Sequence, residues 1–213
     1  NTAAALNIAS ASNISSSGST TLNATTTGAA VAITSTSTST IAATGGLTVN
    51  LNSAGTLNSL ITGGTANAGG LTKQGAGTLT LGNANTLKGT TLVSAGTLAL
   101  GNINALQNST LDTGASGSQL VTFTATGTNT YNLGGLQGSD DMPLGVNSIS
   151  VGSNNSTTTY SGKFTGTGGI TKVGTGNLTL SGDGTSTGDY NANGGTLTLT
   201  ATTGYRSLTG VNV

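Results

Sequence analysis

The sequence predicts an all-β chain wound into a β-solenoid, in which each strand pairs in parallel with the same strand of the next coil. Two observations favour this fold. Residues 69–100 recur at 168–199, a shift of 99 residues without a gap, with 15 identities in 32 positions. The shared residues are glycines, Thr-Lys pairs and Leu-x-Leu segments, which suit the turns and inward-facing strands of a stacked repeat. Residues that favour helices are scarce, and the chain has no Glu. Gly and β-branched residues, which disfavour helices, occur in every stretch of the sequence.

Short alternations of apolar and small polar residues mark the expected strands. In chain order they are Leu47–Leu51, Thr78–Leu81, Thr97–Leu100, Leu120–Phe123, Ile149–Val151, Leu178–Leu180 and Thr196–Leu199. Strands this short are stable only when stacked. A sandwich or barrel of antiparallel hairpins is the competing architecture, although hairpin proteins seldom repeat a long block without insertions. With about 20 residues per coil, the shift of 99 residues corresponds to about five coils and the chain to about ten.

We expect a single domain, 1–213, in which residues 1–68 form less regular coils of the same solenoid. Apolar residues recur through that region, at Leu6, Ile8, Ile14, Leu22, Val31, Ile33 and Ile41. The Thr-Ser alternation of Thr34–Thr40 leaves a flexible linker as the alternative. The segment Gly138–Gly145 holds the single Pro and an Asp pair, and is the best candidate for a loop that leaves the coil.

Charge is almost absent, with 5 basic and 5 acidic residues and a net charge of zero. The chain therefore has no basic footprint for nucleic acid or for an anionic membrane surface. The absence of His and Cys removes the common catalytic triads and the metal sites built on those residues. No apolar run is long enough for a transmembrane helix. The first residues lack the features of a signal peptide, so an exported protein would already have lost its signal.

The remaining polar residues are expected to have structural roles. A Ser–Lys catalytic pair is formally available, but Lys73 and Lys172 lie in the repeat motif and are expected to be solvated turn residues. The five aspartates are expected to cap turns; they are Asp112, Asp140, Asp141, Asp183 and Asp189. Asp140 and Asp141 would face opposite sides of a strand. A weak Ca²⁺ contact is the alternative for Asp183 and Asp189, which share a Gly-rich turn region. We therefore expect no catalytic, cofactor-binding or metal site.

The motif Gly-Gly-Leu-Thr-Lys-x-Gly-x-Gly-Thr-Leu-Thr-Leu, followed by Gly-Thr-Leu-x-Leu, resembles the autotransporter-associated β-strand repeat, also called the passenger-associated transport repeat. Residues 69–101 and 168–200 carry it, and Thr159–Gly169 resembles the segment that usually precedes it. The resemblance implies a bacterial protein, secreted or displayed at the cell surface, with a right-handed parallel β-helix. No translocator domain follows within these residues. The chain is therefore expected to be a passenger, a processed piece, or a secreted protein that carries the repeat.

The two copies depart from the family pattern at one position. The family often has an aromatic residue where this chain has Leu87, and the second copy has Ser186 there with Tyr190 four residues later.

We expect a structural role rather than an enzymatic one, with no cofactor. The segments Ala3–Ile8 and Ser207–Val213 are apolar, uncharged and β-prone, so copies are expected to pair head to tail into a fibre, surface layer or biofilm matrix. One alternative is an adhesin that binds glycans through exposed tyrosines, Tyr131, Tyr160, Tyr190 and Tyr205. Another is a carbohydrate-active enzyme that uses Asp183 and Asp189.

Overall fold

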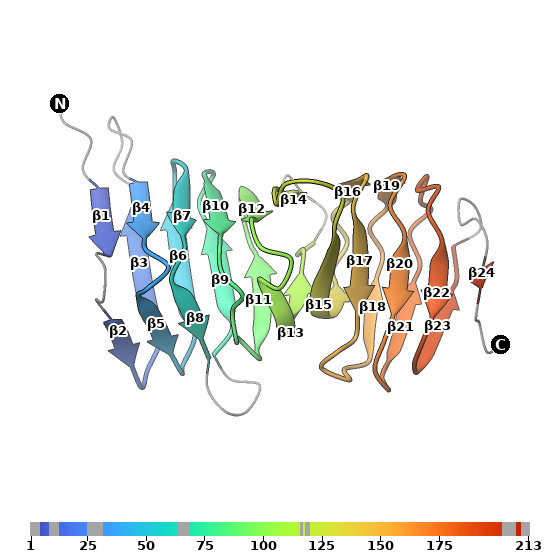
Figure 1. Cartoon of the computed structure of the whole chain (residues 1–213), viewed down its shortest axis with the longest axis horizontal. Helices are drawn as coiled ribbons and strands as arrows, with labels where there is room; N and C mark the ends of the chain where they lie inside the picture. The colour runs from blue at the N-terminus through green and yellow to red at the C-terminus, as the bar shows by residue number, and fades with distance from the viewer. Residues whose placement is uncertain are drawn as a thin grey trace.

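The structure, a computed structural model, describes residues 5–8, 13–24, 32–63, 69–115, 117, 120–201 and 208–209. Within these ranges every regular element is a β-strand, and every strand pairing is parallel. Figure 1 shows the strands side by side along the long axis, with strand numbers rising from one end to the other. The parallel β-solenoid is therefore confirmed.

The strands line three faces of the solenoid. Face I contains β1 (Ala5–Ile8), β4 (Ala32–Ser35), β7 (Gly55–Leu57), β10 (Thr78–Leu81), β12 (Thr97–Leu100), β14 (Leu120–Phe123), β16 (Met142–Gly145) and β19 (Phe164–Gly166). Face II contains β2 (Asn13–Ser16), β5 (Thr40–Ala43), β8 (Leu60–Thr62), β17 (Ser148–Val151), β20 (Ile170–Lys172), β22 (Tyr190–Ala192) and β24 (Leu208–Thr209). Face III contains β3 (Thr20–Ala24), β6 (Leu47–Leu51), β9 (Leu71–Gln74), β11 (Thr90–Val93), β18 (Thr158–Tyr160), β21 (Asn177–Leu180) and β23 (Thr196–Leu199).

Two long strands, β13 (Leu106–Asp112) and β15 (Thr130–Gln137), cross from face II to face III. The second half of β15 pairs with β13, through Leu136 and Leu111, while its first half pairs with β17, through Tyr131 and Ile149. Beyond β15, an isolated bridge joins Gly138 to Tyr160 of β18 and continues face III. The ten-stranded sheet therefore changes face at β15.

The core consists of columns of inward-facing side chains in register from coil to coil. On face I one column runs from Leu57 through Leu81 and Leu100 to Phe123. The three leucines are at most 1% exposed. Burying a leucine of this kind stabilises the fold by roughly 1.5–3 kcal/mol. Because a single coil cannot cover its own interior, each coil depends on its neighbours for this burial.

The middle of the solenoid is filled by aromatic side chains. Phe123 packs on Tyr131 and Tyr160 on Phe164, with ring centroids 4.7 and 4.8 Å apart. Tyr131, Tyr160 and Tyr190 are fully buried. The expectation that an adhesin would expose its tyrosines is therefore wrong for these three residues. Tyr205 lies outside the described residues.

All seven strands expected from the sequence are present, and the region before residue 69 forms coils where it is described. The segment Thr34–Thr40 ends β4, turns, and begins β5, so it is no linker. The coils there are longer than expected, since Thr21 pairs with Thr48 and Thr48 with Thr72. The described strands consequently trace fewer coils than ten.

The expected loop Gly138–Gly145 does not leave the coil. Gly138 forms the bridge to β18, and Met142–Gly145 is strand β16, paired with β19. The Pro and the Asp pair mark an irregular coil instead. Strand β16 tolerates Pro143 because β14 and β16 lie side by side without forming a hydrogen-bonded ladder. No backbone N–H is therefore needed at residue 143.

The two copies of the repeated block lie on different faces. In the first copy, β9 and β11 are on face III, and β10 and β12 on face I. In the second copy, β20 and β22 are on face II, and β21 and β23 on face III. The shift of 99 residues is thus not a whole number of coils. The expectation of five coils between the copies is wrong by one face, because the second copy begins one face before the fifth coil is complete.

Candidate functional site

The most distinctive polar groups of the repeat are two lysines that point into the core. Lys73 on β9 follows Leu71 at a spacing of two, so its side chain shares the inward face of the strand. It pairs in register with Val49 and Val93 of the adjacent coils. Lys172 on β20 lies in the equivalent column, between Val151 and Ala192. The exposed fractions of the two lysines are 0% and 1%, so the expectation that they are solvated turn residues is wrong.

Each lysine ends among three backbone carbonyls at a corner of the solenoid. Lys73 Nζ donates to the carbonyl oxygens of Gln74 at 2.7 Å, Gly75 at 2.8 Å and Ala95 at 3.1 Å. Two acceptors belong to the lysine's own corner and the third to the next coil.

The second copy repeats this arrangement. Lys172 Nζ donates to the carbonyl oxygens of Val173, Gly174 and Gly194, the last two at 3.1 and 3.2 Å. Every acceptor lies 99 residues beyond its counterpart in the first copy. The lysine bonds therefore belong to the repeat itself.

These bonds define what the lysines can do chemically. An ammonium has three hydrogens, and each lysine uses three backbone carbonyls, so none is left to activate a serine. Burial lowers the pKa of Lys73 to about 8 and also lowers the pKa of Lys172. The geometry supports a structural role, in which the cation holds two successive coils together at a corner.

The glycines that follow each lysine allow the corner to close. Gly75 and Gly174 have φ values of 73° and 71°, a region that favours glycine. A Cβ on Gly75 would lie 2.2 Å from the carbonyl oxygen of Leu51, and one on Gly174 would lie 2.0 Å from that of Gly152. The Lys-x-Gly spacing thus encodes a corner packed directly on the corner of the previous coil.

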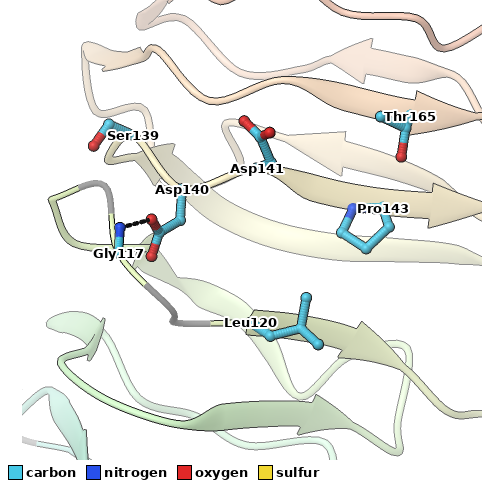
Figure 2. Close-up of a pocket in the computed structure, with 7 residues that line it drawn as sticks. All are labelled: Gly117, Leu120, Ser139, Asp140, Asp141, Pro143 and Thr165. Carbon is cyan, nitrogen blue, oxygen red and sulfur yellow. Dashed lines mark hydrogen bonds between the residues drawn. The ribbon is translucent and has the colours of Figure 1, made fainter.

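An acidic notch opens on face I where β14 and β16 adjoin without pairing (Figure 2). Its volume is about 480 Å³, and its described lining is Gly117, Leu120, Ser139, Asp140, Asp141, Pro143 and Thr165. Asp140 is buried and Asp141 exposed. Figure 2 shows their carboxylates leaving the chain on opposite sides, just before β16 begins. The notch contains two carboxylates, whereas the polar trough described next contains one.

A second pocket, of about 420 Å³, crosses face II at β15, β17, β20 and β22. We call it the polar trough; it is lined by Thr130, Ser148, Thr167, Gly169, Ile170, Thr171, Thr187, Gly188, Asp189 and Asn191. Five of its ten lining residues carry hydroxyl groups, and two are glycines. Its chemistry suits a ligand with many hydroxyl groups rather than an apolar one.

The pair Asp183 and Asp189 does not form a common site. Both side chains are exposed, and Asp189 lines the polar trough whereas Asp183 does not. No group of three or more His, Cys, Asp or Glu residues is close enough to hold a metal within the described ranges. The Ca²⁺ contact expected at these two residues therefore gains no support from their placement.

Sequence reasoning missed the lysine corners, although the signal was present. The alternation that places Leu71 inside also places Lys73 inside. Lysine usually lies in solvent, and the expectation followed that preference. The two-residue period of the strand places the side chain correctly.

Comparison with protein families agrees with this geometry. Residues 71–100 and 170–199 each match the family model described as passenger-associated-transport-repeat. Each matched segment begins at the strand that carries the buried lysine and ends with the third strand after its corner. No curated protein and no solved structure matches the chain in the corresponding searches. No helix in the described parts of the chain is long and apolar enough to cross a membrane.

Proposed function

We propose, from the two passenger-associated transport repeats in this β-solenoid, that the chain is a passenger-type segment of a bacterial protein that is secreted or displayed at the cell surface. Its role is structural and it catalyses no reaction. The observation that carries this proposal is the coincidence of the repeat with the lysine corner, because the repeat then encodes the rod itself and not a site upon it.

The finer part of the proposal is that such rods extend by strand pairing at their ends. The faces end at edge strands, β1, β2 and β3 on one side and β23 and β24 on the other. Within the described residues no further strand pairs with their outer edges, and an unpaired edge is a template for another strand. The same edge suits the next coil of a longer chain or the first coil of a second copy. The near absence of charge leaves little repulsion between copies.

The edge of β3 shows how pairing would proceed. The N–H of Thr20 donates to the carbonyl oxygen of Gly46 in the neighbouring coil. Backbone groups alternate in direction along a parallel strand, so the N–H groups of Thr21 and Asn23 point away from that coil. Both side chains are exposed. In the part of the chain that the structure describes, no backbone acceptor pairs with these two donors, and an incoming strand would supply one.

Sedimentation velocity and electron microscopy across a range of concentrations test this extension. We expect the wild-type protein to form longer particles as concentration rises. Thr21→Pro removes an outward donor without removing a bond to β6, and Asn23→Lys adds charge to the edge, so both should shorten the particles. Thr128→Lys, at an exposed mid-chain position, is the matched control and should assemble normally. Particles that stay single at every concentration would refute head-to-tail assembly.

A glycan-binding role is the second candidate, and the polar trough is the observation that favours it. The trough crosses four coils with hydroxyl and amide side chains and one carboxylate, Asp189. Neutral oligosaccharides screened on an array should bind the wild-type protein and lose affinity for Asp189→Ala. Retention by Asp183→Ala, an exposed aspartate outside the trough, would separate this site from general charge effects. Equal binding by all three proteins would dismiss the trough as a receptor.

A further inference from the structure

The lysine corner of the second copy contains a chemically reactive pair of residues, Asn193 and Gly194. They form the single Asn-Gly dipeptide of the sequence, and the first copy has Ser94-Ala95 in their place. In such a pair the backbone nitrogen of the glycine can attack Cγ of the asparagine side chain, because glycine has no Cβ to obstruct the approach. Both reacting groups belong to adjacent residues, so the attack is intramolecular and has the advantage of proximity.

The structure leaves both reacting groups of this pair unoccupied. The Asn193 side chain is exposed. In the part of the chain that the structure describes, neither this side chain nor the N–H of Gly194 makes a hydrogen bond. The first copy differs at the equivalent nitrogen, since the N–H of Ala95 donates to the carbonyl oxygen of Lys73 at 3.4 Å. The nitrogen that attacks is therefore free in the second copy and bonded in the first.

The groups on either side of the reactive bond are both anchored to Lys172. The N–H of Asn193 donates to the carbonyl oxygen of Lys172 at 2.8 Å, and the carbonyl oxygen of Gly194 accepts from Lys172 Nζ at 3.2 Å. The corner is also closely packed, because a Cβ on Gly194 would lie 3.0 Å from the carbonyl oxygen of Gly174 in the preceding corner. A longer main chain between the two anchors could not keep both bonds.

We propose that Asn193 is a site of spontaneous modification, whose conversion to isoaspartate opens the lysine corner of the second copy. The nitrogen of Gly194 loses its proton and bonds to Cγ of Asn193, and the side-chain nitrogen leaves as ammonia, which gives a succinimide. Water then adds to the ring. Cleavage between the Gly194 nitrogen and the backbone carbonyl carbon of residue 193 gives isoaspartate, and cleavage at Cγ gives ordinary aspartate. Only the isoaspartyl main chain, which runs through Cβ and Cγ, is one atom longer.

The longer main chain removes the bond that joins two coils at this corner. Of the three carbonyls that accept from Lys172, those of Val173 and Gly174 belong to its own corner, and that of Gly194 belongs to the next coil. Displacing Gly194 therefore leaves the ammonium with no acceptor across the coils. The first copy is unaffected, since Ser94 has no side-chain amide to lose. The rod thus loses one of its two lysine corners with age and keeps the other.

Peptide mass spectrometry tests the chemistry in the folded protein. Wild-type protein is kept in warm, mildly alkaline buffer, then unfolded and cut with trypsin, which releases residues 173–206 as one peptide. A zero-time sample corrects for conversion during digestion. We expect the mass change from amide to acid to accumulate at Asn193, and a methyltransferase specific for isoaspartate should label the same peptide. Asn191, which precedes Ala192 in that peptide, is the internal control and should keep its amide.

Two variants copy the first repeat at this position. Gly194→Ala should slow the conversion several-fold, because its Cβ obstructs the attacking nitrogen, and Asn193→Ser should abolish it. If the folded wild type keeps its amide at Asn193 while the chain unfolded in urea loses it, the corner protects the pair and the proposal is wrong. Equal rates for the wild type and Gly194→Ala would also overturn it, since conversion would then not proceed through the Gly194 nitrogen.

Urea denaturation tests the effect on the corner. The midpoint of aged wild-type protein should fall towards that of fresh Lys172→Met, while that of aged Asn193→Ser should not change. Fresh Asn193→Asp carries the new charge on a main chain of normal length, so it should unfold close to the fresh wild type. This variant separates the longer main chain from the charge. An unchanged midpoint after most of the wild-type protein has become isoaspartate would show that the corner does not open.

Discussion

The two repeat copies have the same lysine corner but lie on different faces of the solenoid. In the first copy the corner joins faces III and I, and in the second it joins faces II and III (Figure 1). Yet Lys73 and Lys172 donate to three carbonyls at the same sequence offsets. The comparison shows that the repeat specifies a corner and its two flanking strands, whatever its position around the axis.

Glycine substitution at the corner should produce the largest change. Gly75→Ala and Gly174→Ala each combine a left-handed backbone with a Cβ at 2.2 or 2.0 Å from a carbonyl oxygen, so we expect a loss of about 4 kcal/mol or more in the free energy of unfolding. Gly127→Ala is the control, since its φ is +88° but nothing lies within 4 Å. It should cost only about 1 kcal/mol in urea denaturation. If all three variants lose the same amount, backbone strain alone explains the corner glycines.

Replacing either lysine should have the next largest effect. Lys73→Met and Lys172→Met keep the aliphatic stem and leave three corner carbonyls without their donor, so each should lose about 2–4 kcal/mol in the free energy of unfolding. The two losses should agree because the geometry is shared. Lys88→Met, at an exposed position of the first copy, should change stability by less than about 0.5 kcal/mol. Equal urea midpoints of unfolding for Lys73→Met and Lys88→Met would contradict the stabilising role of the lysine corner.

The two copies also differ in how a pair of buried positions divides the space in the core: each copy has one large and one small side chain, at opposite positions. The first has Leu87 and Thr91 where the second has Ser186 and Tyr190, and all four side chains are buried. Ser186→Leu alone should crowd Tyr190 and cost about 1–3 kcal/mol. Adding Tyr190→Thr should recover part of that loss, with a coupling energy of about 0.5–3 kcal/mol in a double-mutant cycle. Strict additivity of the two changes would mean that the residues do not share one space.

The smallest expected effect is a dependence on pH. The folded pKa of Lys73 is about 8 against 10.5 for an unperturbed lysine, so the unfolded chain binds more protons between these values. The free energy of unfolding should therefore rise as pH increases above 8. Burial raises the pKa of Tyr131 and Tyr190 above 10.0, which reverses the trend at higher pH. Lys73→Met should flatten the rise in urea titrations at pH 8 to 10; an unchanged slope would assign it to other groups.

Strand positions were largely readable from the sequence because a two-residue period and flanking glycines fix both the face and the ends of a short strand. Strands such as Leu47–Leu51 and Thr196–Leu199 begin and end at the expected residues. Asp140 and Asp141 also face opposite sides as expected, although they precede β16 and are not part of it. The change of face between the copies could not be predicted, because it depends on β13 and β15 bending across a corner, which a repeat alignment does not reveal.

The surroundings of Asp140 were also beyond the sequence. Nothing in the neighbouring residues indicates that Gly117, more than twenty positions earlier, holds one oxygen of Asp140 and leaves the other free. That arrangement exists only because consecutive coils stack.

The rotation of one copy relative to the other affects how the rod responds to force. Had both lysines lain at the same corner of the cross-section, the other corners would contain neither set of ammonium bonds. Because they lie at different corners, separating adjacent coils at either corner must break the bond from the lysine to the next coil, at Ala95 or Gly194. Bending in different directions likewise loads different corners. The molecule thus has reinforcement spread around its circumference rather than along one seam.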